Sequence, residues 1–261
     1  DTIFSNFSLD SDEIVRIPPV KCFSSQNQLA WDPEHIQELG LSREMYDFHL
    51  ENEKYVSRLG IQLLCTCAPY LAGNLPIKGE HCAWMESSAI AFINAVIGAR
   101  TNVEGSQSAA ASMLTGKTPY WGLHLDENRV GSHLIRVECD VKSMTDWGLL
   151  GYYAGKMVGS EIPVFDGPRS RPDADKLKHL SAAAASSGGV EMYHIPGVTP
   201  EAASVSDAFK GKRPVDTFVF GEREKREAYQ RLNGSGRDRH VDLVVIGCPH
   251  ASIKQIWQVA R

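Results

Sequence analysis

The sequence predicts an α/β protein built from parallel βαβ units. In residues 130–261, short apolar segments alternate with segments of helical character. The short segments are largely apolar instead of alternating, which is typical of parallel strands covered by helices on both faces. The chain has 261 residues, 43% of them hydrophobic and 23% charged, so it can bury a sizeable core.

Helices are expected to predominate at the start of the chain. Residues 1–31 have weak periodicity and are expected to be irregular. Asp32-Pro33 predicts the start of a short helix, with Asp at the N-cap and Pro at the first position. A second helix is expected from Ser42 to about Leu59. Residues 61–64 are predicted to form a short buried strand.

The rest of the chain predicts a succession of helices and strands. A mostly buried helix is expected from about His81 to Ile97, with Gly98 just beyond its end. The other helices are expected over 106–114, 146–158, 173–187 and 222–232, from Thr199-Pro200-Glu201, and from Ser252 onward. The other strands are expected over 134–141, 162–165, 190–195, 217–220 and 241–246.

Charge and composition exclude several classes of partner. Lys and Arg number 27 and Asp and Glu 32, which gives a net charge of −5 and argues against nucleic acid or an anionic membrane as main partner. No apolar run reaches the roughly 18–20 residues of a membrane span. Six irregularly spaced cysteines without a signal peptide indicate reduced thiols in a cytoplasmic protein.

Polar residues are expected where predicted strands end, which is where parallel sheets collect ligands. Cys67, His194, and Cys248 with His250 occupy such positions. A thiol beside a helix N-terminus is expected to have a lowered pKa, which suits metal binding. Iron–sulfur and zinc sites usually need three or four ligands, so the two thiols need more. Candidates are Cys65, Cys82, His81, His250 or a residue outside the chain.

Three polar stretches are further candidates for a site, over residues 79–88, 98–105 and 124–129. The second offers an Arg, an Asn and a Glu, which could hold a compact carboxylate. The competing interpretations are a capping and packing set for the first stretch and a solvated loop for the third.

These motifs, taken in order, resemble the aconitase X family. The match runs through Cys67-Ala-Pro-Tyr-Leu, Gly79-Glu-His-Cys-Ala-Trp-Met-Glu-Ser-Ser, Gly98-Ala-Arg-Thr-Asn-Val-Glu-Gly, Leu123-His-Leu-Asp-Glu-Asn-Arg, Pro196-Gly-Val-Thr-Pro-Glu-Ala and Gly247-Cys-Pro-His-Ala-Ser. Six motifs in the family's order over residues 60–255 make the resemblance specific.

The resemblance implies an aconitase-like hydro-lyase that dehydrates a small hydroxy acid. Known activities act on cis-3-hydroxy-L-proline or phosphomevalonate; the moderate charge content, unlike that of a hyperthermophile, favours the first. The family uses an iron–sulfur cluster, expected here as 2Fe–2S, or a mononuclear iron. Cys67 and Cys248 match its cysteine positions. A small swivelling domain or subunit is the expected partner.

Dehydration needs a base for the C–H proton and donors for the developing enolate charge. The expected catalytic groups are His81, Glu86, Ser87 and Glu104. The expected substrate-binding groups are Ser88, Arg100, Thr101, Asn102 and His124.

The chain begins at Asp1 and ends inside a predicted helix, so we expect it to be a segment of a larger protein. Residues 1–59 are then part of a truncated domain, and residues 60–261 form an aconitase-like catalytic region that is incomplete at its C-terminus. Two other functions remain open. One is a non-catalytic large subunit that binds a small acid, and the other is an enzyme that uses Cys248 as a nucleophile with His250.

Overall fold

The computed structural model describes residues 16–26, 32, 34–234, 240, 242 and 244–261. The chain divides into two units, one of residues 1–66 with 110–117 and one of residues 67–109 with 118–261. Each has a hydrophobic cluster of its own. None of the helices in the described ranges is long and apolar enough to span a membrane. The predicted boundary at residue 60 stays a prediction.

Helix α1 (Arg43–Arg58) of the first unit confirms the helix expected from Ser42. The Ser42 hydroxyl caps it by accepting the Met45 N–H at 3.2 Å. The strand expected over 61–64 is wrong, because only Gln62 finds an extended partner, Ser25. The helix expected from Asp32 is also wrong, since residues 34–40 form turns; Pro33 lies outside the described residues.

A parallel three-stranded sheet organises the second unit and confirms the predicted α/β class. The strands are β1 (His133–Val137), β2 (Pro163–Asp166) and β3 (Asp216–Phe220), in the order β2-β1-β3. His133 pairs with Pro163 on one side and with Asp216 on the other.

Two predicted strands are wrong in the second unit. Over 190–195, only His194 pairs, through a single bridge to Val164. Residues 244–246 are exposed and have no strand partner, although their side chains are apolar. Positions 241 and 243 of that predicted strand lie outside the described residues.

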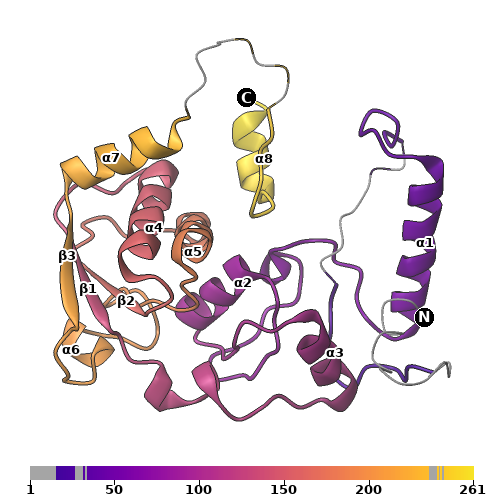
Figure 1. The fold of residues 1–261 in the computed structure, drawn as a ribbon, viewed down its shortest axis with the longest axis horizontal. Helices are drawn as coiled ribbons and strands as arrows, with labels where there is room; N and C mark the ends of the chain where they lie inside the picture. The colour runs from indigo at the N-terminus through magenta and orange to yellow at the C-terminus, as the bar shows by residue number, and fades with distance from the viewer. Residues whose placement is uncertain (1–15, 27–31, 33, 235–239, 241, 243) are drawn as a thin grey trace. The chain divides into compact units, whose positions relative to one another are not determined.

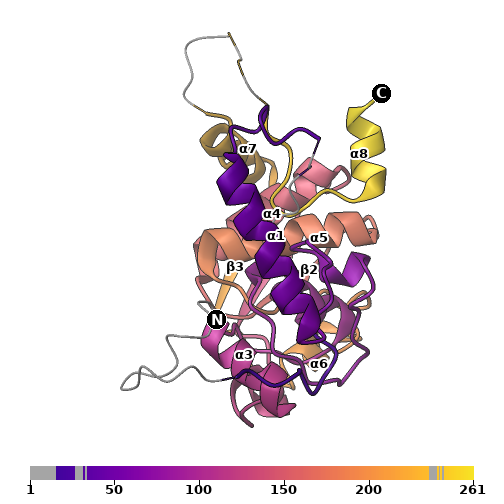
Figure 2. The ribbon, with the colours of Figure 1, turned by 90° about the vertical axis from the view of Figure 1, so that its right-hand side faces the viewer.

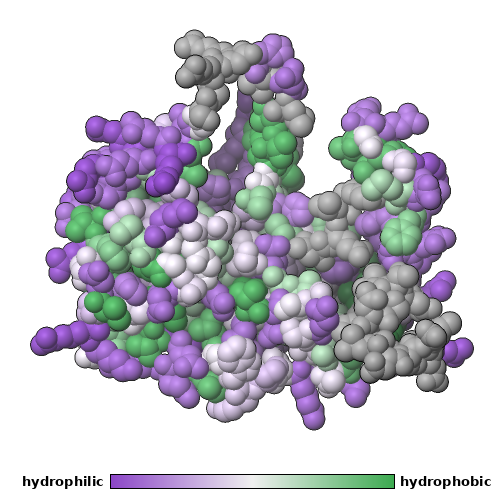
Figure 3. All heavy atoms as spheres, viewed as in Figure 1, coloured by the Kyte–Doolittle hydropathy of each residue, from purple (hydrophilic) through white to green (hydrophobic). Residues whose placement is uncertain are grey.

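Helices pack against this sheet (Figures 1 and 2). On one face, Ile135, Val137, Phe165 and Phe220 join the main core with α4 (Met144–Val158) and α5 (Ala174–Gly188). On the other face, Leu134 and Val164 pack against α6 (Val205–Ala208). Helix α7 (Glu222–Leu232) packs beside α4, and its outer surface is hydrophilic (Figure 3).

Other helices carry the polar motifs. They are α2 (Ser87–Phe92), a π-helical turn (Ile93–Ile97), α3 (Ser106–Thr115), α8 (Ile253–Val259) and short 3₁₀ turns over Pro69–Leu71, Gly122–His124 and Asp126–Asn128. The predicted end at Gly98 is confirmed, and its φ of 78° is one that glycine adopts without strain.

Two predicted helix starts are wrong. The long helix does not begin at His81, because His81 and Trp84 form extended bridges to Arg100 and Val103. Thr199-Pro200-Glu201 forms a turn, because the Thr199 N–H donates back to the Ile195 carbonyl. The helix that follows is capped by Ser204 instead.

Glycines on α4 let its backbone lie close to α5. A Cβ added at Gly151 would lie 2.4 Å from the Leu180 carbonyl oxygen. One at Gly155 would lie 2.6 Å from the Ala184 carbonyl oxygen. Since backbone atoms cannot move aside as a side-chain end can, these glycines are required by packing.

We expect Gly151→Ala to lower the free energy of unfolding by about 1–3 kcal/mol, because the added methyl group overpacks the contact between α4 and α5. Urea denaturation measures the change. Gly105→Ala is the control, since an added Cβ there meets nothing closer than 3.9 Å. Equal denaturation midpoints for the two variants would refute the packing requirement.

Candidate active site

Cys67 and His250, 183 residues apart, are held together by two reciprocal hydrogen bonds. The Cys67 N–H donates to His250 Nδ1 at 2.9 Å, and the His250 N–H donates to Cys67 Sγ at 3.0 Å. Cys248 lies two residues before His250, is exposed, and has a φ of 50°. The structure therefore brings the loops of the two predicted metal ligands to one place in the second unit.

Burial raises the pKa of the Cys67 thiol above its ordinary value. The charges of Glu86 and Cys248 raise this pKa further, while the His250 N–H and Lys178 lower it. The expectation of a lowered pKa is therefore wrong for Cys67, because desolvation and neighbouring negative charge outweigh the favourable hydrogen bond. A cation bound at the thiol would lower its pKa instead.

Glu86 and Ser88 lie at the start of α2, near this thiol. Glu86 is the residue before the first turn, and the buried Ser88 hydroxyl donates to Glu86 Oε1 at 3.3 Å. Ser87 is exposed in the same turn. The ring of Tyr70 stacks on Phe92, with ring centroids 4.1 Å apart.

The Tyr70 hydroxyl is buried and has no hydrogen-bond partner among the residues that the structure describes. Burial raises its pKa, and the charges of Cys67 and Glu86 act in the same direction. The Tyr70 hydroxyl therefore stays protonated and is available as a donor near the Cys67 thiol.

His81 and His124 form a second polar group. Their Nδ1 atoms lie 2.8 Å apart and their rings stack, so one nitrogen carries the proton that the other accepts. His124 is buried and its Nε2 lies 3.3 Å from the Thr118 hydroxyl. Burial and the neighbouring His81 lower the pKa of His124, although the charge of Glu104 opposes them.

Arg100 lies beside this histidine pair. Its guanidinium donates to the His124 carbonyl at 2.9 Å and forms an ion pair with Asp126. The hydrogen bond and charge of Arg100 lower the pKa of Asp126. A substrate carboxylate at Arg100 would compete with Asp126, so the predicted role of Arg100 requires that this exposed ion pair opens.

Thr101 and Asn102 are buried and hold loops together. The Trp84 N–H donates to Thr101 Oγ1 at 3.0 Å, and the Leu123 N–H donates to Asn102 Oδ1 at 2.7 Å. Both side chains thus form hydrogen bonds with other groups of the protein, and their substrate-binding role stays a prediction. The predicted site residues fall into two groups of contacts, one at Cys67 and one at His124.

Sequence reasoning gave no role of its own to two cations that the structure buries. Arg129 donates to the carbonyls of Asn94, Ala99 and Leu123 at 2.9–3.1 Å and pairs with Glu201 at 2.6 Å. Lys178 lies on α5 with a residue exposure of 1%. A helical signal could have found it, since Lys178, Ser181, Ala182 and Ala185 recur at the spacing of one helical face and all are buried.

Two thiols fit part of an iron or iron–sulfur site by their chemistry, and Cys67 and Cys248 would hold the group. The described residues contain no set of three or more His, Cys, Asp or Glu side chains placed to bind a metal. His250 uses Nδ1 for Cys67, His81 pairs with His124, and Cys65 contacts Gln26 within the first unit. Whether one of these residues completes the site stays a prediction.

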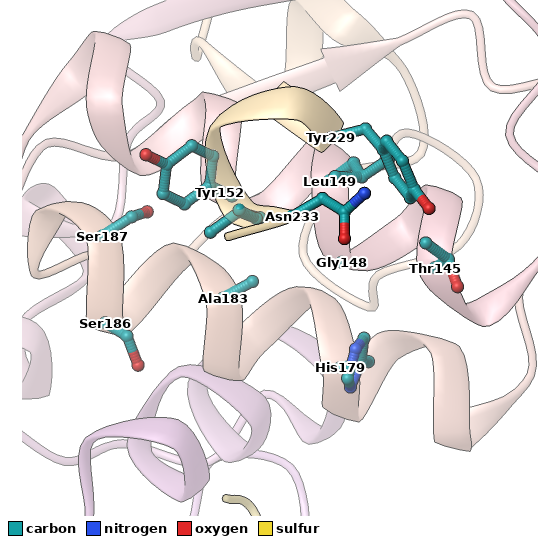
Figure 4. A pocket seen from close by; sticks show the side chains of 11 residues that line it. Thr145, Gly148, Leu149, Tyr152, His179, Ala183, Ser186, Ser187, Tyr229 and Asn233 are labelled. Atoms are coloured by element: carbon teal, nitrogen blue, oxygen red, sulfur yellow. The ribbon is translucent and has the colours of Figure 1, made fainter. Parts of the chain in front are cut away.

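A groove of about 510 Å³ lies elsewhere in the second unit, between α4, α5 and the end of α7 (Figure 4). Tyr152, His179 and Tyr229 line it together with small and apolar residues. It contains none of the residues predicted for the site.

The second unit has an α/β fold in which helices pack against a parallel sheet. Distant loops bring two thiols and a carboxylate to one part of it, and thiols are ligands that soft metals prefer. Residues 15–127 match the model of the aconitase X first domain, and residues 131–230 match that of the aconitase X second domain. The chain belongs to the aconitase X family. This confirms the predicted family.

Characterised relatives carry dehydratase names. The phosphomevalonate dehydratase large subunit of Methanocaldococcus jannaschii is 39% identical over 93% of this chain and 60% of its own length. The cis-3-hydroxy-L-proline dehydratase of Pseudomonas aeruginosa is 37% identical over 94% of this chain and 42% of its own length. The chain thus spans about three fifths or less of these two relatives.

A solved structure supports the same family. The crystal structure of Thermococcus kodakaraensis aconitase X in its holo form has a TM-score of 0.76 and 33% identity, and the match covers 94% of this chain and 59% of that one. The fold described above is therefore the aconitase X fold.

We expect the stability of the second unit to fall as the pH drops below about 6.5, the ordinary pKa of histidine. The folded state lowers the pKa of His124, so below pH 6.5 the unfolded chain binds a proton that the folded protein does not. The loss is at most about 1.4 kcal/mol per pH unit. Denaturation of wild type and His124→Gln between pH 8 and pH 5 measures it, and equal pH dependence in the two proteins would exclude His124 as the source.

Proposed function

We propose that this chain supplies the thiol and acid–base groups of a hydro-lyase that removes water from a small hydroxy acid. The observation that carries the proposal is the meeting of Cys67, the Cys248–His250 loop and Glu86 in a member of a family whose characterised relatives are named dehydratases.

Dehydration breaks a C–H bond and a C–O bond, so it needs a proton acceptor and help for a poor leaving group. Cys67 and Cys248 would hold an iron–sulfur or mononuclear iron group, which would supply Lewis acidity toward the hydroxyl and carboxylate of the substrate. The Glu86 carboxylate accepts the C–H proton, and the Ser88 hydroxyl orients that carboxylate through Oε1. The Tyr70 hydroxyl donates to the developing enolate charge.

The histidine pair serves as a proton reservoir in this proposal. His81 is exposed and its Nδ1 is hydrogen-bonded to Nδ1 of the buried His124, so the pair links the protein surface to its interior. The charge of Glu104 opposes the lowering of the His124 pKa that burial and His81 cause. Arg100 binds a substrate carboxylate once Asp126 releases it.

Two substrates are candidates. The identity of 39% and 41% to two phosphomevalonate dehydratase large subunits supports phosphomevalonate. The moderate charge content and 37% identity to a cis-3-hydroxy-L-proline dehydratase support cis-3-hydroxy-L-proline. Both are hydroxy acids with a carboxylate, and both enter the assay in parallel. A small subunit is the proposed partner, which the large-subunit names of the relatives support.

The nucleophile alternative has less support. His250 Nδ1 accepts the Cys67 N–H, so this nitrogen is not available to deprotonate the Cys248 thiol. A non-catalytic large subunit stays a second candidate only if substrate binds without turnover.

We expect anaerobically purified protein to contain iron, and both Cys67→Ser and Cys248→Ser to lose it while keeping the circular dichroism spectrum of the wild type. Cys22→Ser, an exposed thiol of the first unit, is the control and retains the iron. Iron and sulfide analysis with a visible spectrum makes the measurement.

Turnover is measured on the complete protein with a small subunit of the dehydratase type, using both substrates. Product formation that Glu86→Gln lowers by about 10²–10⁴-fold supports the acid–base role. Iron retained in both cysteine variants would refute the ligand assignment. Substrate binding without product in the wild type would favour the non-catalytic subunit.

A further inference from the structure

Lys178 is a buried ammonium group that the proposed mechanism does not use. Its side chain is 1% exposed, and no carboxylate of the described residues lies within ion-pair distance of it. Burying a lysine without a negative partner is costly, so such a residue needs compensating contacts. Burial lowers the pKa of Lys178, while the charges of Asp175 and Cys67 oppose this.

Both hydrogen bonds of Lys178 reach the segment that carries Cys248. The ammonium donates to the His250 carbonyl oxygen at 2.6 Å and to Gln255 Oε1 at 2.8 Å. Gln255 is in turn fixed by the Ser252 N–H at 2.9 Å and by Met144 Sδ at 3.0 Å. Lys178 therefore ties both the loop and the first turn of α8 to α5.

His250 links Lys178 to the Cys67 thiol through hydrogen bonds. The carbonyl of His250 accepts from Lys178, and the N–H of His250 donates to Cys67 Sγ. A shift of His250 would move the N–H that donates to Cys67 Sγ. It would also move the backbone of Cys248, two residues earlier. One ammonium is thus hydrogen-bonded to the residue that donates to Cys67 and lies two positions after Cys248.

We infer that Lys178 is a positioning residue that holds the Cys67 and Cys248 thiols together and offsets the negative charge of their thiolates. The second part of this inference rests on the proposed function, whereas the first part holds for the protein without metal. The buried ammonium of Lys178 lies near enough to Cys67 for their charges to interact. Such a cation offsets the charge of a thiolate-bound metal group, which is negative overall when the thiolates outnumber the metal charge.

A second lysine that holds α8 provides a matched control. Lys254, on the same helix, pairs with Asp173 at 3.2 Å and with Asp175 at 3.4 Å. The Lys254 side chain is exposed, and within the described part of the chain it forms no hydrogen bond with His250. Lys254→Met therefore loosens α8 without touching the thiol pair, whereas Lys178→Met releases His250.

The test on metal-free protein is cross-linking with dibromobimane, which bridges two neighbouring thiols by forming two thioethers and releasing two bromide ions. Peptide mapping identifies the linked cysteines. We expect wild type, Lys254→Met and Lys178→Arg to form the Cys67–Cys248 link, and Lys178→Met to form about tenfold less. Lys178→Gln, a neutral donor, serves if the methionine variant does not fold.

The test on the iron-loaded complete protein is its reduction potential. Removing a nearby positive charge favours the oxidised group, so we expect a more negative potential in Lys178→Met, restored by Lys178→Arg and unchanged in Lys254→Met. A purely structural residue would change iron content without this shift.

The outcomes separate the two proposals. A link that is absent in wild type, or equally strong in Lys178→Met or Lys178→Gln, overturns the positioning role. A link that depends on Lys178 in a wild type that takes up no iron supports that role and refutes the proposed cofactor. An unchanged potential in iron-loaded Lys178→Met overturns the charge-offsetting role.

Discussion

The buried guanidinium of Arg129 connects the segments on which the polar motifs of the second unit lie. It donates to carbonyl groups of residues 94, 99 and 123 and forms an ion pair with Glu201. A buried charge persists only where its donors are satisfied, and here the acceptors are supplied by loops far apart in the chain. The π-helical turn, the residues just after it and the turn before His124 therefore take their positions together.

The structure confirms the parts of the fold whose signals are local. The Ser42 cap and the charged sequence of α7 predict helices within a residue or so, and the three paired strands are near their expected places. The wrong strand predictions lie in short apolar segments at residues 61–64, 190–195 and 244–246. A short apolar run becomes a strand only when a neighbour pairs with it, and that neighbour is not visible in the run itself.

The site was predictable in its residue types but not in its contacts. The motif order indicates the family, and the loops that carry two candidate ligands do meet. The contact of Lys178 with His250 was not predictable, because the two residues lie 72 positions apart in the chain. Arg100 and Asn102 were predicted as substrate ligands from their chemistry, yet the structure shows each already bonded to protein groups. Sequence spacing carries no information on such competition.

The distance along the chain between Cys67 and His250 has a consequence for biosynthesis. At about 5–20 residues per second, the ribosome needs roughly 10–40 s to make the 183 residues between them. During that interval the Cys67 thiol lacks the N–H that stabilises it and is open to oxidation in its newly made segment. The pair can form only after the whole sheet has been synthesised. The thiol site therefore forms late in the synthesis of each molecule. Until then the cell must protect the Cys67 thiol from oxidation.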